Sequence, residues 1–255
     1  MRKFFIAAFF SMMIGMGLPL SAAAQPSVLE TQKANGKIAE VFNRREDSIK
    51  KKFTELNLNW PPQSMYIRSF KYDRKLEVWV KSSATEPYRY YTTYPVCMQS
   101  GALGPKRMEG DYQVPEGFYY INELNPNSSY HLSMGLNYPN ASDRILSDSL
   151  HPGSEIYIHG NCVSVGCIPI SDGPIEDLYV LAAYVKSNGQ DFIPVHVFPV
   201  KYDVEKSMNY LMELTKENES YRKFSLNLKK AFDYFEDTRQ LPLISINKKG
   251  NYIIN

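Results

Sequence analysis

The sequence predicts a mainly β domain, folded as a sandwich or a partly closed barrel, with helical segments attached at both ends. Between Met65 and Val200, short runs rich in Tyr, Val, Ile and Phe alternate with clusters of Gly, Pro and Asn, which is typical of strands joined by turns. Before and after this stretch, apolar residues recur at helical spacing instead. We therefore divide the chain into residues 1–24, 25–63, 64–200 and 201–255.

The first segment, residues 1–24, has the three parts of a secretory signal peptide. Arg2 and Lys3 precede an apolar run that extends to about Leu20, and the small residues Ser21–Ala24 follow it. A membrane anchor is the alternative, but the unbroken apolar run is shorter than the roughly 18 residues that a spanning helix needs, and no positive cluster follows it. We therefore expect cleavage after Ala24 and export, with the removed signal as the only link to a membrane.

The charge of the mature chain is balanced. The full sequence has 29 Lys and Arg against 27 Asp and Glu, and the signal peptide holds two of the basic residues and no acidic one, which leaves 27 of each. This balance argues against nucleic acid or another polyanion as the main partner. About 230 residues remain after cleavage, enough for one good core with an appendage.

Segments 25–63 and 201–255 are predicted to be helical. The first has apolar residues spaced as one face of an amphipathic helix: Ile38, Val41, Phe42, Ile49, Phe53 and Leu56. Trp60-Pro61-Pro62 then ends this helical lead-in. The second predicts helices at Val204–Thr215 and Ser220–Arg239, the latter with a solvated face and a buried stripe of Leu226, Leu228, Phe232 and Phe235.

Segment 64–200 supplies the predicted sheet. We expect strands at Ser64–Phe70, Lys75–Lys81, Arg89–Cys97, Gly117–Ile121, Glu155–His159 and Ile193–Val200. One stretch differs, because apolar residues repeat at helical spacing over Pro174–Ser187. A helix is therefore predicted directly after the segment that holds the last cysteine.

Three cysteines remain after export: Cys97, Cys162 and Cys167. In an oxidising compartment an odd number leaves at least one thiol unpaired. Either Cys97 is bridged to Cys162, or all three are reduced. Both alternatives leave Cys167 available for chemistry.

The residues from Glu155 to Pro169 carry the candidate chemistry. A predicted strand ends at His159, and a loop rich in Gly and Ser then presents Cys167. A thiol is a useful nucleophile near neutral pH when an imidazole or a helix N-terminus stabilises its thiolate. The backbone amides around Gly166 and Cys167 could converge on an oxyanion. This arrangement suits acyl transfer through a thioester.

Three other interpretations compete with catalysis. A structural cysteine beside a histidine at a strand end is a common arrangement. A zinc site at His159, Cys162 and Cys167 is disfavoured, because the spacing matches none of the usual zinc pairings. A redox pair of Cys162 and Cys167 is disfavoured because four residues separate them, where C-x-x-C has two. We expect no metal and no cofactor.

The run His-Gly followed by Ser-x-Gly-Cys, at residues 159–167, resembles the active-site signature of the L,D-transpeptidases of the YkuD fold, specifically their YafK-like branch. Ser100–Lys106 and Gly110–Tyr119 look like the Gly- and Pro-rich segment of that family, ending in its P-x-G-x-[FY] strand. Tyr130–Asn140 is similar to the substrate-side segment of the branch. The resemblance covers roughly Tyr66 to Val200 and implies a YkuD-like catalytic domain over residues 64–200.

The resemblance also implies roles for single residues. Cys167 matches the nucleophile and His159 its general base, while a backbone carbonyl near Gly160 orients the imidazole. Ser164 and Gly166 match the turn that shapes the oxyanion pocket. No carboxylate is required in this set.

The implied substrate is the stem peptide of peptidoglycan in the periplasm of a Gram-negative bacterium. His131 and Tyr138 lie in the substrate-side segment, and we expect them to contact substrate. The commoner signature has a His where this chain has Val165 and an Arg within the stretch 168–170, which here reads Ile-Pro-Ile. Hydrolysis is therefore favoured over transfer, with release of a wall-anchored protein as one possible outcome. A non-catalytic wall-binding module on the same scaffold is the alternative.

Overall fold

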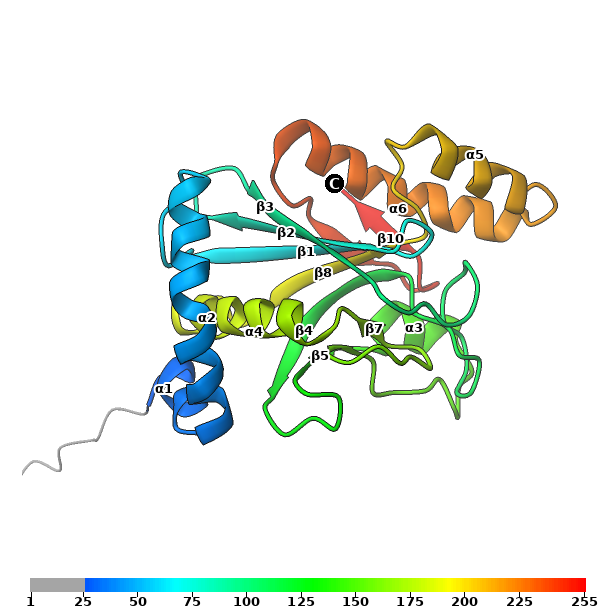
Figure 1. Ribbon diagram of the computed structural model, residues 1–255. Coiled ribbons are helices and arrows are strands. Elements are labelled where there is room, and N and C mark those ends of the chain that lie inside the picture. Colours follow the sequence, from blue (N-terminus) through cyan, green and yellow to red (C-terminus); the bar gives the residue numbers. More distant parts are fainter. Residues whose placement is uncertain (1–25) are drawn as a thin grey trace, which may run out of the picture.

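The computed structural model describes residues 26–255, and the predicted signal peptide lies outside the described residues (Figure 1). Its centre is one eight-stranded sheet with the strand order β3-β2-β1-β8-β4-β5-β6-β7. The strands are β1 (Ser64–Phe70), β2 (Lys75–Lys81), β3 (Arg89–Pro95), β4 (Gly117–Asn125), β5 (Ser133–Leu136), β6 (Tyr157–His159), β7 (Ile168–Pro169) and β8 (Ile193–Phe198). The sheet curls into a half-barrel, which confirms the predicted β-rich domain with flanking helices.

The sheet mixes parallel and antiparallel pairs. The strands β1, β2 and β3 form an antiparallel meander, while β1 pairs with β8 in parallel. The strands β8, β4, β5 and β6 continue antiparallel, and β6 pairs with β7 in parallel. The helix α4 (Asp172–Ser187) connects β7 to β8 and packs across one face of the sheet. The short strand β7 lies at the sheet edge, next to β6, the strand that ends at His159.

The lead-in forms two helices, α1 (Val28–Lys33) and α2 (Gly36–Glu55), where one amphipathic helix was predicted. The side chain of Asn35 accepts a hydrogen bond from the Ile38 amide and so caps the start of α2. The predicted apolar face of α2 is buried against α4, and Leu56 is partly buried at its end. Trp60 then packs edge-on against Phe53, with ring centroids 5.0 Å apart.

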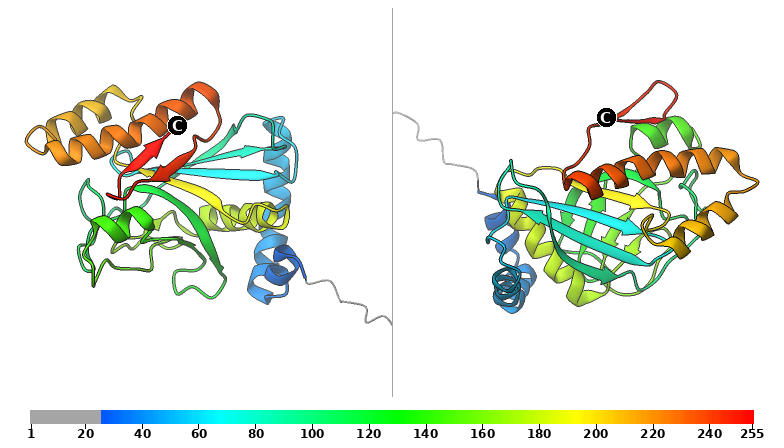
Figure 2. Two further views of the ribbon diagram at one scale, coloured as in Figure 1. Left: turned by 180° about the vertical axis from the view of Figure 1, so that it is seen from behind. Right: turned by 90° about the horizontal axis from the view of Figure 1, so that it is seen from above.

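The C-terminal segment covers the opposite face of the sheet. It contains α5 (Glu205–Leu214) and α6 (Glu219–Thr238), and then the hairpin of β9 (Ile244–Ile246) and β10 (Tyr252–Ile254), which was not predicted. Figure 2 shows α6 lying across the strands on the side away from α4. Phe232 and Phe235 are buried as expected, whereas Leu226 is only half-buried. Among residues 26–255, no helix is long and apolar enough to cross a membrane.

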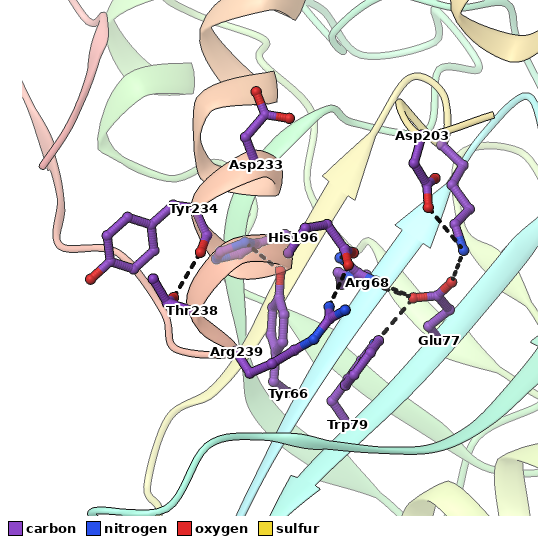
Figure 3. Close-up of polar contacts among 12 residues, drawn as sticks. Tyr66, Arg68, Glu77, Trp79, His196, Asp203, Asp233, Tyr234, Thr238 and Arg239 are labelled. Carbon is purple, nitrogen blue, oxygen red and sulfur yellow. Dashed lines mark hydrogen bonds and ion pairs between the residues drawn. The ribbon is translucent and has the colours of Figure 1, made fainter. Parts of the chain in front are cut away.

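A buried network of ion pairs links α6 to the sheet (Figure 3). Arg68 of β1 bonds Glu77 of β2 at 2.5 Å and Glu236 of α6 at 2.6 Å. Beside this network the hydroxyl of Tyr66 lies 2.7 Å from Nδ1 of His196. Burial, together with the charge of Arg68, lowers the pKa of His196 to about 3, so this imidazole stays neutral. The network links the helix to the sheet rather than forming a second reactive site.

Candidate active site

The parallel pair of β6 and β7 brings Cys167 and His159 together. Ile158 is opposite Ile168 and His159 is opposite Pro169 in this register, so Cys167 lies beside Tyr157. The Tyr157 amide indeed donates to the Cys167 sulfur at 3.4 Å. Cys167 directly precedes β7, and its sulfur contacts the Tyr157 amide and the Glu155 carbonyl; among residues 26–255 no hydrogen bond joins it to the His159 imidazole. A strand spacing of ~4.8 Å and a rise of ~3.3 Å per residue put the Cα atoms of Cys167 and His159 about 8 Å apart across the strand pair.

One hydrogen bond fixes the tautomer of His159. Its Nδ1 lies 2.5 Å from the carbonyl oxygen of Gly160, and a carbonyl only accepts, so Nδ1 carries the proton. Nε2 is therefore the nitrogen that can accept a proton from a thiol. Burial lowers the pKa of His159, and the bond to Gly160 opposes this in part, so the imidazole is neutral near pH 7. The ring of Tyr130 lies against the imidazole, with centroids 4.7 Å apart.

Cys167 is a free thiol that is partly buried. Burial raises its pKa, the Tyr157 amide lowers it, and the charge of Glu155 raises it further. The resting pair is thus a neutral thiol and a neutral imidazole, without the stabilisation of a thiolate that an imidazole or a helix N-terminus can give. The N-terminus of α4 does not stabilise a thiolate at Cys167, because β7 lies between Cys167 and the start of α4 at Asp172. The Asp172 carboxylate accepts a hydrogen bond from the Asn161 amide at 2.7 Å instead.

The loop before Cys167 is shaped by Ser164 and Gly166. The Ser164 hydroxyl donates to the Cys167 carbonyl at 2.7 Å and accepts from the Gly166 amide at 3.2 Å. Gly166 has φ +129°, and a Cβ there would stand 3.2 Å from the Gln113 carbonyl oxygen, so only glycine fits without strain. Because the Gly166 amide is engaged by Ser164, the Cys167 amide is the better placed donor for an oxyanion.

Gly160 must be a glycine for a different reason. A Cβ at this position would lie 2.7 Å from the Asp172 carboxylate and 2.8 Å from the Tyr130 carbonyl oxygen. The absence of a side chain lets the segment containing Tyr130 approach the turn after His159. The aromatic ring beside the imidazole therefore depends on Gly160.

A disulfide joins Cys97 to Cys162, with Cα atoms 5.8 Å apart, and so selects the first of the two alternatives drawn from the sequence. The Cys97 amide donates to the Pro169 carbonyl at 3.0 Å, which lays the segment after β3 alongside β7. Because Cys162 is bonded to Cys97, it is not paired with Cys167 in a redox couple. Within residues 26–255, no three His, Cys, Asp or Glu side chains gather as metal ligands would.

His131 lies close to the turn after His159 but is bound to other groups. Its Nε2 is 2.8 Å from Oε1 of Glu176 on α4, and Arg44 of α2 bonds the same carboxylate oxygen at 2.6 Å. The ammonium of Lys37 donates to the His131 carbonyl. His131 thus connects the N-terminal helices to the site, and its contact with substrate stays a prediction.

Tyr138 lies in the core, with 6% of its surface exposed. Its hydroxyl donates to the Pro152 carbonyl at 2.7 Å, and burial raises the pKa of the phenol. This bond braces the segment that leads to Glu155, whose carbonyl lies 3.6 Å from the Cys167 sulfur. The contact of Tyr138 with substrate also stays a prediction.

Sequence reasoning passed over two residues that touch the reacting groups. Tyr130 stacks on His159, and the Tyr157 amide contacts the Cys167 sulfur. Tyr130 lies in the substrate-side segment, so its position near the site could have been predicted. The backbone amide of Tyr157 could not, because nearly every residue has one. Val165, at the position of the family's second His, is exposed on the nucleophile loop.

Comparisons with known proteins identify the family of this chain. Residues 61–197 match the family model described as the YkuD L,D-transpeptidase catalytic domain. A candidate L,D-transpeptidase named YafK, from Escherichia coli strain K12, is 32% identical over 193 residues, covering 75% of this chain and 74% of that protein.

Solved structures with a similar fold include the helical cell shape determining protein Pgp2 from Campylobacter jejuni (16% identity, TM-score 0.43, 74% of each chain). Bd1075 from Bdellovibrio bacteriovorus is another (20% identity, TM-score 0.40, 74% of this chain and 79% of that one). The family match over more than half of the chain, together with the YafK relative, shows that this protein belongs to the YkuD family of L,D-transpeptidase catalytic domains.

Proposed function

We propose that this protein is a cysteine acyl-transfer enzyme that cleaves L,D peptide links in peptidoglycan stem peptides, with Cys167 as nucleophile and His159 as base. One observation carries the proposal: the β6–β7 register sets Cys167 beside the strand that ends at His159, and the Gly160 carbonyl accepts from Nδ1 of the imidazole and so leaves Nε2 unprotonated. Membership of the YkuD family supports peptidoglycan as the substrate.

In the acylation step the Cys167 sulfur attacks the substrate carbonyl while Nε2 of His159 takes the thiol proton. Burial lowers the pKa of His159 and raises that of Cys167, so the thiol keeps its proton until the attack, when Nε2 accepts it. The oxyanion is stabilised by the Cys167 amide. The C–N bond then breaks, the imidazolium returns its proton to the leaving amine, and a thioester remains on Cys167.

The residues that follow Cys167 in the sequence bear on which acceptor resolves the thioester. Ile168, Pro169 and Ile170 are buried and apolar where the commoner family signature has an Arg. Without that cation the loop offers no bidentate partner for the carboxylate of an incoming peptide. Water is therefore the favoured acceptor, and the reaction would release a wall-linked peptide or protein.

Intact-mass measurement after incubation with a carbapenem, an acylating agent implied by the family resemblance, tests the proposal. We expect one adduct per molecule, mapped to the peptide containing Cys167 and absent from Cys167→Ala. His159→Gln should slow its formation, because the thiol loses its proton acceptor. A folded protein without any adduct would favour the wall-binding module instead.

A further inference from the structure

A second concave site lies on the C-terminal segment, apart from Cys167. It is a cavity of about 810 Å³ between α6, β10 and the helix α3 (Ala141–Leu146). Figure 2 shows the red hairpin that contains β10 next to the green helix α3 and the orange helix α6. Its lining includes three cations, two aromatic rings and an amide: Arg107, Lys223, Lys230, Phe224, Tyr252 and Asn227. None of the described residues that line it is acidic.

The positive charge of this cavity, called the α6 pocket below, is available to a ligand. Lys223 is paired only with Glu219 on the exposed face of the same helix, at 2.7 Å, and pairs of this kind hold little free energy. Arg107 lies 3.4 Å from the buried Asp143, and its guanidinium stands 5.7 Å from the ring of Phe224. Three positive groups around one hollow form a local field that favours anions.

Hydrogen bonds within the protein hold the floor of the α6 pocket in place. Asn227 donates to the Tyr252 carbonyl at 2.8 Å, which fixes β10 against α6. The Tyr252 hydroxyl accepts from Asn140 at 2.8 Å, which fixes the same strand against the start of α3. A ligand would therefore meet a preformed site and would not have to order it.

The α6 pocket is connected to the active site through one segment. The Arg107 carbonyl accepts from the Asp148 amide at 2.7 Å, so Arg107 is anchored next to the segment that leads toward Glu155. Six residues further on, the Gln113 carbonyl oxygen lies 3.2 Å from the position of a Cβ on Gly166. Six residues span at most about 20 Å, so a single extended wall fragment can reach both places.

We propose that the α6 pocket binds the carboxylates of a second stem peptide and so holds the wall while Cys167 acts on a neighbouring link. The proposal rests on the proposed function, because the wall is the substrate there. Stem peptides offer several carboxylates, and a cavity of this volume suits a ligand of that size. Apart from Arg107 and Leu146, the lining comes from beyond residue 197, so the α6 pocket belongs largely to the part outside the family match.

Co-sedimentation with purified sacculi tests this inference, using Cys167→Ala protein so that no turnover occurs. Reversing the charge of Lys223 and Lys230 together, as Lys223→Glu/Lys230→Glu, should weaken binding about ten-fold at low salt and less at high salt. Lys216→Glu is the matched control, because Lys216 lies after α5 with 66% of its side chain exposed, against 74% for Lys223, and is also paired with a glutamate. It should bind as the parent does.

Sacculi whose stem carboxylates have been amidated should bind the parent protein as weakly as untreated sacculi bind the double variant. Unchanged binding by the double variant would overturn the inference, as would an equal loss in Lys216→Glu. Loss of binding to vesicles of anionic lipid, with sacculus binding intact, would overturn it as well and assign the α6 pocket to lipid. Failure of the proposed function is distinguishable, because it would show as no carbapenem adduct on Cys167 in the wild-type protein.

Discussion

A buried ion pair behind the active-site loops offers a quantitative test of the structure. Glu116 is 0% exposed and lies 3.0 Å from the ammonium of Lys71, which is 2% exposed. The same carboxylate accepts from the Gly104 amide at 2.7 Å and from the Tyr221 hydroxyl of α6 at 3.1 Å. Lys71 also donates to the Val114 carbonyl at 2.8 Å. One pair thus ties the end of β1, the segment 104–116 and the C-terminal helix together.

Glu116→Gln keeps the shape of the side chain and removes its charge. The Lys71 ammonium is then left buried without its hydrogen-bonded counter-charge, although the charge of Asp111 still acts on it, and the loss costs about 3–5 kcal/mol of unfolding free energy. Burial already lowers the pKa of Lys71, and the Glu116 carboxylate opposes this. In the variant the folded-state pKa falls further below the unfolded value, so the unfolded chain binds more protons. Stability then rises with pH, and the deficit should shrink between pH 7 and pH 10.

Urea unfolding of the wild type and Glu116→Gln at these two pH values measures the effect. Lys71→Met/Glu116→Gln should recover part of the loss, because no unpaired charge is left behind. Glu219→Gln removes one partner of an exposed pair and is the control, with no expected change in stability. A loss below about 1 kcal/mol in Glu116→Gln, or a deficit that does not depend on pH, would refute the reasoning.

Three further results are expected. The acylation rate should fall on the acid side only below pH 6.5, because the pKa of His159 is lowered. The rate of alkylation of Cys167 should rise only above pH 9.0, because the pKa of this thiol is raised. Stopped assays over a range of pH values check both rates. Tyr138→Phe should lower the unfolding free energy by about 1 kcal/mol through loss of the bond to Pro152, and a raised KM would bear out the predicted substrate contact, whereas an unchanged KM would contradict it. Cys97→Ser/Cys162→Ser, which opens a loop of 65 residues, should cost about 4 kcal/mol in urea unfolding, and a smaller loss would mean that the loop stays closed without the bond.

The elements with strong local patterns were predicted well. Ser64–Phe70 and Lys75–Lys81 begin and end as expected, because β-branched and aromatic residues lie between clear turn signals. The strand Ser133–Leu136 was missed, because Met134 and Gly135 have no strand preference and the segment is buried on both faces. The hairpin after α6 was missed although Asn247 and Gly250 mark its turn.

The sequence offered candidate site residues but not their arrangement. The spacing of His159 and Cys167 placed both near one loop, but the register of β6 and β7 sets how the two residues lie across the strand pair, and register depends on contacts far along the chain. The helix α4 begins at Asp172, two residues before the expected Pro174, so its N-terminus lies at the turn after His159. The neutral state of the thiol follows from burial, which the sequence does not record.

Mass spectrometry of muropeptides released from purified sacculi tests the central claim most directly. Wild-type protein should produce a new species with the mass of a hydrolysed L,D link, unchanged in mass when a D-amino acid is added as a competing amine. Cys167→Ala should produce no such species while still binding sacculi. The same products from Cys167→Ala, or no change in the profile from folded wild-type protein, would contradict Cys167 as the acyl-transfer nucleophile.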